Sequence, residues 1–546
     1  MSAAAGATGV LAAALAEALP RLCADGETIE PAVVELIAAL GLALENGILE
    51  LDFCSPAPEG LDAGRWPEHY RQALARSPLV AEAGALDGAP EAPLVLVGER
   101  LRWRRWHRQL ETTLDALIAR ARTAPAAQHP ATAGDDGDLR IAARLDPQQR
   151  QAVAAALRHG LLLLSGGPGT GKTSTVVQLL AAHLERHPRL RFQLAAPTGK
   201  AAARLREALE LGCDALPPPL AGCVLAAPCV TLHRLLESTG ERFGRHAGRP
   251  LELDLLVVDE MSMVDLPLMA ALLEALPADC RLVLVGDPDQ LPPVGPGPVL
   301  QELMQPGRRE QLGPAAVDLR TTYRNAGAIA AVTAALRQAG PISLAALEPR
   351  LRQLDPEANL RWLQAPAQQP PAAAVAALAE QQRRLAGLAA ALPSDDEARS
   401  EAATALLREL ERCVLLTPVR QGRWGVEGLH RQLLGEVAAR PCGQWPPGTP
   451  VLNRRNLPDQ GLANGDVGVL VGSGTNRRVL FPGGRQLHPA RLGQAEPALA
   501  LTVHKAQGSQ YRTVWLLLPP GRDWDARLLY TGLSRAREQA WLITPG

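Results

Sequence analysis

GGPGTGKTS, residues 166–174, carries one of the three lysines of this 546-residue chain. The stretch follows the apolar run LLLLS (161–165) and precedes a helical pattern, which is the setting of a P-loop. Its glycines let the backbone wrap a phosphate with N–H groups, and a helix N-terminus adds partial positive charge. A compact ammonium suits such a cradle better than the wide fork of arginine. The stretch therefore predicts a nucleotide-binding α/β domain.

The bulk composition limits the classes of protein that remain. Hydrophobic residues make up 47% of the chain and the formal net charge is −1, so a polyanion would have to bind in a local groove. The eight cysteines form no C-x-x-C pair, which favours reduced thiols in a cytosolic protein over a zinc site or disulfide framework. The first 20 residues lack the basic region of a signal peptide. No apolar run approaches the roughly 20 residues that span a bilayer.

The first 122 residues are expected to form a helical domain without a catalytic signature. The segments Leu11–Leu19 and Val33–Leu44 show helical apolar spacing. A later stripe repeats at intervals of three and four, and consists of Trp103, Trp106, Leu110, Leu114 and Leu117. Two interpretations of the stripe stay open, ordinary core and a docking face for a partner. The polar stretch TAPAAQHPATAGDDGD (123–138) is predicted to be a linker.

Beyond the linker, short apolar runs alternate with helical patterns, which is typical of parallel sheets covered by helices. The runs of the first unit, expected over 139–314, are LLLLS (161–165), RFQLAAP (191–197), LDLLVVDE (253–260) and RLVLVGD (281–287). Those of the second unit, expected over 315–440 and 498–546, are CVLLTPV (413–419), TVWLLLP (513–519) and AWLITP (540–545). Residues 366–403 indicate a surface-helical or partly disordered insertion. Hairpin signals predict a small barrel over 441–497.

Acidic and amide residues follow the predicted strands of the first unit. In LLVVDE (255–260), Asp259 is placed to join Thr173 in a Mg²⁺ shell, and Glu260 to activate the attacking water. In GDPDQLPP (286–293), Gln290 is a candidate sensor of the γ-phosphate. A turn-capping amide is the alternative interpretation of Gln290.

Further candidate ligands of a nucleotide lie at the two ends of the first unit and near the C-terminus. Gln149 in LDPQQRQAV (145–153) can both donate to and accept from an adenine edge. Tyr323 and Arg324 in LRTTYRN (319–325) offer an aromatic face and a guanidinium, and Arg535 in YTGLSRAR (530–537) offers a second guanidinium. With 56 basic residues in the chain, a single Arg is more often a solvated surface group, so these assignments depend on the surrounding motifs.

The two remaining lysines lie beside strands in similar settings. APTGKAAA (196–203) contains Thr198 and Lys200, and TVHKAQG (502–508) contains Thr502, His504 and Lys505. Backbone, hydroxyl and ammonium groups in such positions can hold a phosphodiester without reading its sequence. Helix starts with a hydroxyl cap are the alternative interpretation of both segments.

Taken in order, these segments resemble the motifs of superfamily 1 helicases. The resemblance covers residues from about 140 to 546, and its finer wording is similar to the RecD family, the alpha chains of exodeoxyribonuclease V. The segments that carry it are SGGPGTGKT, APTGKAAARL, TLHRLLE, VVDEMSMVD, GDPDQLPPVGPG, TTYRN, LTPVRQGRWGVEGLH, NGDVGV, TVHKAQGSQY and LLYTGLSRAR. The N-terminal WRRWHRQLE region fits the family's helical domain less specifically. One departure is Gln510, where many relatives carry Glu in motif V.

The resemblance implies an α/β fold with two tandem RecA-like domains, a helical N-terminal partner-docking domain (1–122) and an inserted SH3-like barrel (441–497). It implies an ATP- and Mg²⁺-dependent motor with 5'→3' polarity on single-stranded DNA. The implied catalytic residues are Lys172, Glu260, Gln290, Arg324 and Arg535. The implied nucleotide ligands are Gln149, Gly166, Gly167, Pro168, Gly169, Thr170, Gly171, Lys172, Thr173, Ser174 and Tyr323, with Thr173 and Asp259 for the metal. The implied DNA contacts are Thr198, Lys200, Thr502, His504 and Lys505.

The resemblance also implies partners and a compartment. RecB-like and RecC-like subunits in a cytoplasmic heterotrimer acting in double-strand break repair are expected, and no membrane. The sequence shows no carboxylate–lysine constellation of a nuclease, so nuclease activity is expected to belong to another chain. Two alternatives stay open, a stand-alone helicase of the same fold and a nucleotide-gated scaffold. DNA-stimulated ATP hydrolysis distinguishes the scaffold from either motor.

Overall fold

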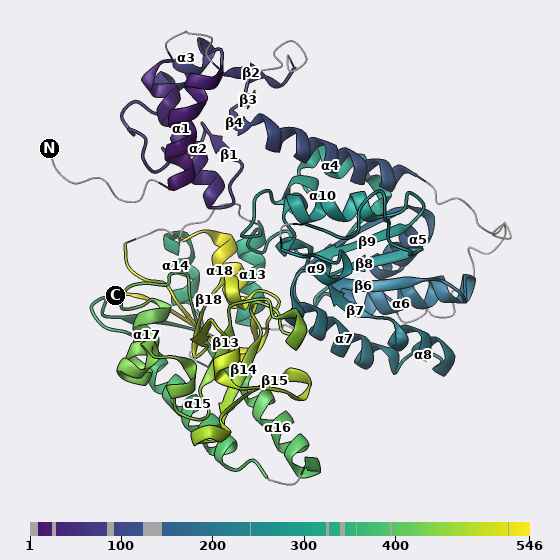
Figure 1. Ribbon diagram of the computed structural model, residues 1–546, viewed down its shortest axis with the longest axis vertical. Helices are drawn as coiled ribbons and strands as arrows, with labels where there is room; N and C mark the ends of the chain where they lie inside the picture. Colours follow the sequence, from purple (N-terminus) through teal and green to yellow (C-terminus); the bar gives the residue numbers. More distant parts are fainter. Residues whose placement is uncertain are drawn as a thin grey trace.

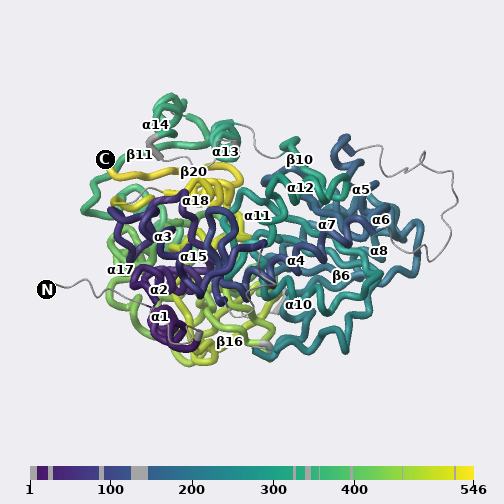
Figure 2. The backbone as a smooth tube through the Cα atoms, turned by 90° about the horizontal axis from the view of Figure 1, so that it is seen from above, coloured from purple at the N-terminus to yellow at the C-terminus, as the bar shows by residue number. Residues whose placement is uncertain are grey.

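The chain folds into three parts that are visible in Figures 1 and 2: an N-terminal region and two α/β units. This computed structural model describes residues 9–23, 29–84, 92–123, 145–240, 242–323, 327–338, 344–355, 357–393, 396–521 and 524–546. The predicted linker lies outside these residues beyond Thr123. Among the helices of the described residues, none combines the length and apolar character that a bilayer crossing requires.

The first α/β unit is built on a six-stranded sheet in the order β10-β5-β9-β8-β6-β7, with every pairing parallel. Its strands are β5 (Leu161–Gly166), β6 (Phe192–Ala196), β7 (Cys229–Thr231), β8 (Leu255–Val258), β9 (Arg281–Gly286) and β10 (Ala316–Leu319). Four of these match the predicted runs, because fully buried strands read as continuous apolar segments. The predicted boundary at 314 is wrong: β10 pairs with β5, so the first unit extends to Leu319.

Helices cover both faces of this sheet (Figure 1). They are α5 (Pro147–Arg158), α6 (Lys172–Arg186), α7 (Gly199–Cys213), α8 (Pro218–Ala226), α9 (Leu232–Leu235), α10 (Leu266–Ala275), α11 (Val299–Leu303) and α12 (Pro306–Leu312). Two buried clusters, one on each face, hold the helices to the strands. Since all six strands run parallel, their carboxyl ends share one edge, and the candidate residues that follow the strands gather there.

The second α/β unit repeats this plan with five parallel strands in the order β11-β20-β19-β12-β18. The strands are β11 (Leu360–Ala365), β12 (Cys413–Thr417), β18 (Ala500–Thr502), β19 (Tyr511–Leu517) and β20 (Ala536–Pro545). The helices are α13 (Ala328–Gln338), α14 (Leu344–Arg352), α15 (Ala372–Ala390), α16 (Asp396–Leu410), α17 (Val426–Leu434) and α18 (Ala526–Leu533). The segment expected to be a surface insertion is a packed element, because α15 buries Leu378 and Leu385.

An antiparallel sheet interrupts the second unit between α17 and β18. Its strands are β13 (Pro450–Asn453), β14 (Val467–Val471), β15 (Arg478–Phe481), β16 (Arg485–Leu487) and β17 (Ala495–Pro497), in the order β16-β15-β14-β13-β17. Glycines at positive φ, Gly465 (+98°) and Gly472 (+76°), lie at either end of β14 where the chain reverses. Trp445 and Phe481 are fully buried in the cluster beneath the sheet.

The N-terminal region is not purely helical, which corrects the expectation from its sequence. Beside α1 (Val10–Cys23), α2 (Pro31–Glu45) and α3 (Glu68–Ala75) it contains a four-stranded sheet in the order β1-β4-β3-β2. The strands are β1 (Glu50–Asp52), β2 (Val80–Glu82), β3 (Leu94–Val97) and β4 (Arg100–Trp103). The turn between β3 and β4 places Gly98 at φ +58°, a two-residue hairpin connection. Strands of three or four residues leave too short an alternation to distinguish from a helix.

The long helix α4 (Arg104–Arg122) carries the predicted apolar stripe and joins the N-terminal region to the first unit (Figure 1). Leu110, Leu114 and Leu117 are buried in the same cluster as strand residues of the first sheet. The Arg120 guanidinium donates to the carbonyl oxygens of Cys280 and Pro277, each at 2.8 Å. Of the two interpretations of the stripe, the structure therefore supports ordinary core for its leucines.

Candidate nucleotide site and interdomain cleft

The P-loop lies between β5 and α6 at the carboxyl edge of the first sheet. Gly169 (φ +76°) and Gly171 (φ +83°) take left-handed conformations that L side chains rarely adopt. The Lys172 ammonium curls into the loop and donates to the carbonyl oxygens of Gly166 at 2.5 Å and Gly167 at 3.0 Å. The geometry is a backbone cradle with one cation at its centre.

Close contacts explain why several of these positions are glycine. A Cβ at Gly171 would lie 2.5 Å from Nε2 of Gln149, and one at Gly166 would lie 2.6 Å from the Thr170 hydroxyl. That hydroxyl donates to the Gly167 carbonyl at 2.9 Å and holds the loop's curl. Thr173, in the first turn of α6, and Pro168, at the tip of the loop, are both half-buried, whereas Ser174 is exposed.

The acidic pair, Asp259 and Glu260, follows β8. In the sheet, β9 lies between β8 and β5, the strand that leads into the P-loop. Asp259 accepts a hydrogen bond from the backbone N–H of Glu260 at 2.8 Å. Burial, with the adjacent Glu260 carboxylate, raises the pKa of Asp259 to about 6, against the charge of Lys172 that lowers it. Glu260 itself sits at φ +54°, ψ +44°. A left-handed glutamate costs on the order of 1–3 kcal/mol and is held only when its surroundings enforce it, as functional sites do.

Gln290 lies in a buried polar cluster after β9. Its Nε2 donates to Oδ2 of Asp287 at 3.1 Å, and the Tyr530 hydroxyl from α18 donates to the same oxygen at 2.7 Å. Within the described residues, Oε1 of Gln290 is buried without a hydrogen-bond partner. A buried acceptor with no partner is costly. The unpaired oxygen is consistent with a ligand that donates a hydrogen bond at this position. The capping interpretation of Gln290 accounts only for its amide nitrogen, which donates to Asp287.

Gln149 and Tyr323 meet beside the P-loop, although 174 positions separate them. Gln149 Oε1 accepts from the Asp146 N–H at 3.2 Å, closing a capping box at the start of α5. The Tyr323 hydroxyl donates to Oδ2 of Asp146 at 2.6 Å, and its N–H donates to the Gly169 carbonyl at 2.8 Å. The Tyr323 side chain stays 59% exposed, which leaves an open aromatic face over the edge of the cradle.

The predicted guanidinium ligands are placed differently from one another. Arg324 lies outside the described residues. Arg535 is buried, and its hydrogen bonds go to groups of the second unit: the carbonyl oxygens of Thr531 at 3.1 Å and Ser509 at 3.3 Å, and the Ser534 hydroxyl at 3.0 Å. To reach a phosphate at the P-loop, Arg535 would have to break these hydrogen bonds and donate to phosphate oxygens instead.

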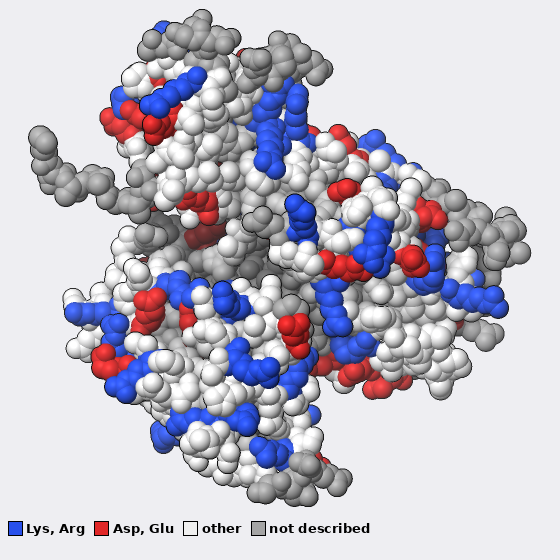
Figure 3. Space-filling model, in the orientation of Figure 1, with Lys and Arg blue, Asp and Glu red and all other residues white. Residues whose placement is uncertain are grey.

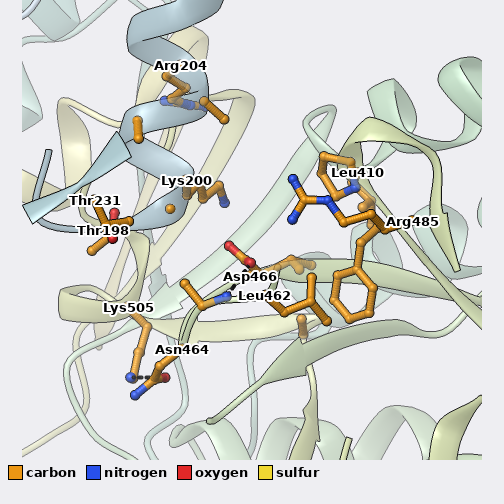
Figure 4. Close-up of a pocket in the computed structure, with 18 of the residues that line it drawn as sticks. Thr198, Lys200, Arg204, Thr231, Leu410, Leu462, Asn464, Asp466, Arg485 and Lys505 are labelled. Atoms are coloured by element: carbon orange, nitrogen blue, oxygen red, sulfur yellow. Dashed lines mark hydrogen bonds between the residues drawn. The ribbon is translucent and has the colours of Figure 1, made fainter. Parts of the chain in front are cut away.

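A cavity of about 1300 Å³ lies where the two α/β units meet, away from the P-loop. It is enclosed by α7 of the first unit, the second sheet and the antiparallel insert. Its lining includes three of the predicted DNA contacts, Thr198, Lys200 and Lys505. Figure 4 shows Lys200, Arg485 and Asp466 pointing toward one another across it. Of the charged side chains in the lining, six are basic and four acidic; the basic ones are Lys200, Arg204, Arg206, Arg234, Arg485 and Lys505.

The predicted DNA contacts also serve the local fold. The Thr198 hydroxyl accepts from the Ala201 N–H at 3.2 Å as the N-cap of α7, and the Thr502 hydroxyl accepts from the Lys505 N–H at 3.3 Å. Thr198 is thus a helix cap, as the alternative interpretation held, whereas the N-cap of the 3₁₀ turn His504–Ala506 is Val503 and not Thr502. Burial lowers the pKa of His504. Burial, with the nearby Arg454, also lowers the pKa of Lys505, whose ammonium donates to Asn464 of the insert at 3.3 Å.

One face of the molecule outside the cavity carries charges of both signs. On the face drawn in Figure 3, Lys and Arg side chains interleave with Asp and Glu over all three parts. A polyanion is therefore directed to a local concentration of cations, as the net charge of −1 requires.

Three residues at the cleft were not identified from sequence: Asp287, Asp289 and Arg337. Asp287 accepts the two hydrogen bonds described above, and Asp289 Oδ2 accepts from Nε of Arg337 at 2.5 Å. A Cβ at Gly167 would lie 3.3 Å from Nη1 of Arg337. The available signal was that Arg337 is the single charged residue in the helix AIAAVTAALRQ.

The residues at the cleft fit a nucleoside triphosphate with Mg²⁺. The cradle has no room for side chains at Gly166 and Gly171, and it centres on the Lys172 ammonium. Mg²⁺ takes few protein ligands beside substrate phosphates, and Thr173 and Asp259 are the groups that would supply them. Consistent with this, the described residues contain no group of three or more His, Cys, Asp or Glu side chains placed to hold a metal by themselves.

Two protein-family models match the chain. One described as an AAA domain matches residues 149–296, and one described as a UvrD-like helicase C-terminal domain matches residues 497–543. The first range contains the P-loop, the acidic pair and Gln290, and the second contains Thr502, Lys505 and Arg535.

Curated relatives match over nearly the whole chain. The RecBCD enzyme subunit RecD of Mycolicibacterium smegmatis is 36% identical over 540 residues, which cover 94% of this chain and 89% of the relative. The subunit RecD of Mycobacterium tuberculosis (strain H37Rv) is 34% identical over 568 residues, covering 98% and 91%. The ATP-dependent RecD2 DNA helicase of Deinococcus radiodurans is 30% identical over 511 residues, covering 91% of this chain and 61% of that protein. Among solved structures, the Pif1 helicase from Bacteroides in complex with ADP-AlF3 and ssDNA covers 74% of this chain and 92% of its own, at 16% identity and a TM-score of 0.40.

Proposed function

Because the chain belongs to the RecD family of ATP-dependent DNA helicases, we propose that it is the 5'→3' motor subunit of a RecBCD-type exodeoxyribonuclease V. The observation that carries the proposal is the position of two features on one interface. A phosphate cradle occupies one edge of the contact between the two α/β units, and a cavity with a basic excess occupies the other. Motion of one unit against the other would therefore change both edges together.

The residue roles follow from the placement of each side chain. Lys172 neutralises the terminal phosphates, and Thr173 and Asp259 hold Mg²⁺, which when bound offsets further phosphate charge. Glu260 takes a proton from the attacking water. Gln290 contacts the γ-phosphate through an N–H of its amide nitrogen, which carries two hydrogens and gives one to Asp287, while Gln149 and Tyr323 hold the base. Arg324 and Arg535 remain proposed as charge-stabilising residues supplied by the second unit.

Movement on DNA would use the residues around the cavity. In the proposed cycle the second unit closes on the cradle when triphosphate is held there, and Lys200 of the first unit shifts relative to Lys505 of the second. Hydrolysis weakens the grip of the second unit and the cleft reopens. Since a ligand shifts an equilibrium only through different affinity for the two states, the contacts of the second unit with the nucleotide determine how strongly closure is driven.

The family relatives point to an assembly and a domain plan. The RecBCD subunits of Mycolicibacterium smegmatis and Mycobacterium tuberculosis are covered over 89% and 91% of their length, that of Haemophilus influenzae over 68%, and the RecD2 helicase over 61%. The two most fully covered relatives favour a complex-forming subunit over a stand-alone helicase. The N-terminal region is proposed to dock RecB-like and RecC-like partners in the cytoplasm, and the antiparallel insert to be an SH3-like barrel. The tandem α/β units are proposed to be RecA-like domains.

The decisive experiment removes the cation of the cradle. Lys172→Gln keeps a polar side chain but removes its charge, so DNA-stimulated ATP hydrolysis should fall by about 1000-fold or more, the scale of losing several kcal/mol of transition-state stabilisation. Exposed Arg383, which pairs with Glu380 on the surface, supplies the matched control Arg383→Ala. Unwinding of a duplex with a 5' single-stranded tail, and co-purification with two larger chains, test polarity and assembly. ATP turnover by Lys172→Gln at the wild-type rate would refute the proposal.

A further inference from the structure

Arg337 brings a guanidinium of the second unit to the P-loop of the first. It lies in the last turn of α13 and pairs with Asp289, which follows β9, at 2.5 Å between Nε and Oδ2. About a third of each side chain is exposed, 32% for Arg337 and 31% for Asp289. The pair is therefore partly withdrawn from water yet still accessible to a ligand entering the cleft.

Gly167 is approached from two directions by cations. Lys172 donates to its carbonyl oxygen at 3.0 Å. A Cβ built on Gly167 would lie 3.3 Å from Nη1 of Arg337 and 3.0 Å from the Tyr530 hydroxyl. Any larger side chain at position 167 would displace the guanidinium. The loop that wraps a phosphate thus meets a charge from each unit, with Lys172 inside the curl and Arg337 against its outer wall.

The contacts around Asp289 show which group holds Arg337. The neighbouring carboxylate, Asp287, receives hydrogen bonds from Gln290, Tyr530 and the Asp289 N–H at 3.2 Å. These donors are neutral, so Arg337 supplies the cationic partner for the Asp287–Asp289 pair. Burial acts to raise the pKa of Asp289, whereas the bond from Arg337 acts to lower it. A phosphate beside Gly167 would compete with Asp289 for the same guanidinium.

The geometry of arginine permits that competition. A guanidinium carries five donors in a planar fork, and only Nε is used by Asp289 here. Nη1 is the nitrogen closest to Gly167, and a guanidinium binds phosphate through pairs of its N–H groups. Arg535, by contrast, already spends Nε, Nη1 and Nη2 on acceptors of its own unit.

We propose that Arg337 is a phosphate-binding residue that the second unit contributes to the triphosphate at the P-loop, and that Asp289 holds it in place until the phosphate arrives. The inference rests on the proposed ATP site. It adds to that site a contact that distinguishes a triphosphate from a diphosphate, and it assigns Asp289 the role of a competing anion. Transfer of Arg337 from Asp289 to phosphate then couples the loop after β9 to closure of the second unit.

The test measures binding to the full-length chain with Mg²⁺ and a fluorescent non-hydrolysable ATP analogue, compared with the matching fluorescent ADP. Arg337→Ala should weaken the triphosphate by about 10- to 100-fold, the size of one lost charge-assisted hydrogen bond, and the diphosphate by less than about threefold. Asp289→Asn should bind the triphosphate about threefold or more tightly, since its competing charge is gone. The double variant should behave as Arg337→Ala alone. Arg383→Ala, on the far surface, is the matched control.

Two results would overturn the inference. The first is equal weakening of triphosphate and diphosphate in both single variants, which would make the ion pair a clamp between the units only. The second is an Arg337→Ala chain that binds both nucleotides as wild type does. If the wild-type chain binds neither nucleotide, the proposed ATP site fails, and the inference fails with it. If wild type binds and Lys172→Gln does not, the ATP site stands whatever Arg337 shows.

Discussion

The two α/β units share an architecture and differ in chemistry. Each has a parallel sheet with helices on its faces, but the phosphate cradle, the acidic pair and the buried amide of Gln290 all belong to the first. The second unit places polar side chains of α13 and α18 against that site instead, through Arg337 and Tyr530. Repetition of a fold has therefore not repeated an active site. It has produced one candidate site, with a second wall that the other unit supplies through Arg337 and Tyr530.

The second unit contacts the first at both edges of their interface. At the edge near the P-loop, the Leu291 N–H donates to the Thr531 hydroxyl oxygen at 2.8 Å, and the Leu291 carbonyl accepts from Nε2 of Gln507 at 2.9 Å. At the cavity edge, Arg204 of α7 donates to the Gln510 carbonyl at 3.0 Å and lies 3.6 Å from Glu411. Gln507 and Gln510 are three residues apart in the same segment. This segment therefore connects the edge near the P-loop with the edge near the cavity.

The largest expected difference between the units concerns the chemical step. Glu260→Gln keeps the shape of the side chain but cannot accept a proton, so the turnover number for ATP should fall by about 100-fold or more, while nucleotide affinity changes little. Glu436, an exposed glutamate of the second unit, supplies the control Glu436→Gln, with turnover as in wild type. Steady-state kinetics with single-stranded DNA measure both. Loss of affinity with unchanged turnover would place Glu260 in binding and contradict its assignment as the base.

A second difference concerns stability below neutral pH. His430 on α17 is buried, and its Nε2 accepts from the Ala500 N–H at 3.1 Å. Burial lowers its pKa to about 4, so the unfolded chain binds more protons as pH falls from about 6.5, and stability is lost in that direction. From pH 7.5 to 5 this single group should reduce the unfolding free energy by about 2 kcal/mol, and His430→Gln should remove that part of the loss.

Tryptophan fluorescence can follow this unfolding in the second unit, because no Trp lies between Trp106 and Trp362. Exposed His488, in the insert of the second unit, supplies the control His488→Gln, which should retain the wild-type pH dependence. His183, buried in α6 with a pKa lowered to about 3 by burial, adds a similar dependence in the first unit, outside the reach of this probe. Identical pH slopes for wild type and His430→Gln would contradict the assignment.

The smallest expected effect is at the cavity edge. Replacing Lys505 or Arg485 by Ala should weaken single-stranded DNA binding by about 10-fold at moderate salt, and each lost phosphate contact should reduce the salt slope by roughly 0.7. The affinity for nucleotide should not change, since both residues line the cavity. Arg383→Ala serves again as control. Titration of fluorescent oligothymidylate over a range of salt concentrations measures both quantities, and an unaltered slope in both variants would exclude the cavity as the DNA path.

The sequence predicted the parts of the site that contiguous residues build. A P-loop depends on glycines and a lysine at fixed spacing, and LLVVDE places its carboxylates directly after a strand. Four of the six strands of the first sheet and three of the five strands of the second were predicted, because buried parallel strands read as unbroken apolar runs. The capping role of Thr198 was also predicted as an alternative.

What the sequence did not predict depends on contacts between distant segments. Arg337 and Asp289 are 48 positions apart and meet only because the second unit docks on the first. The strand β10 pairs with β5 across more than 150 positions, which no local pattern announces. The N-terminal sheet was missed because its strands are only three or four residues long, and a short run does not distinguish strand from helix.

The central claim, that both α/β units bind the terminal phosphate of one nucleotide, is tested most directly by an experimental structure. The sample would be the Glu260→Gln chain with ATP, Mg²⁺ and a short oligothymidylate. The claim predicts the Lys172 ammonium and at least one guanidinium of the second unit within about 3 Å of oxygens on the same γ-phosphate. A γ-phosphate bound at the P-loop by groups of the first unit alone, with every described arginine of the second unit out of reach, would contradict it.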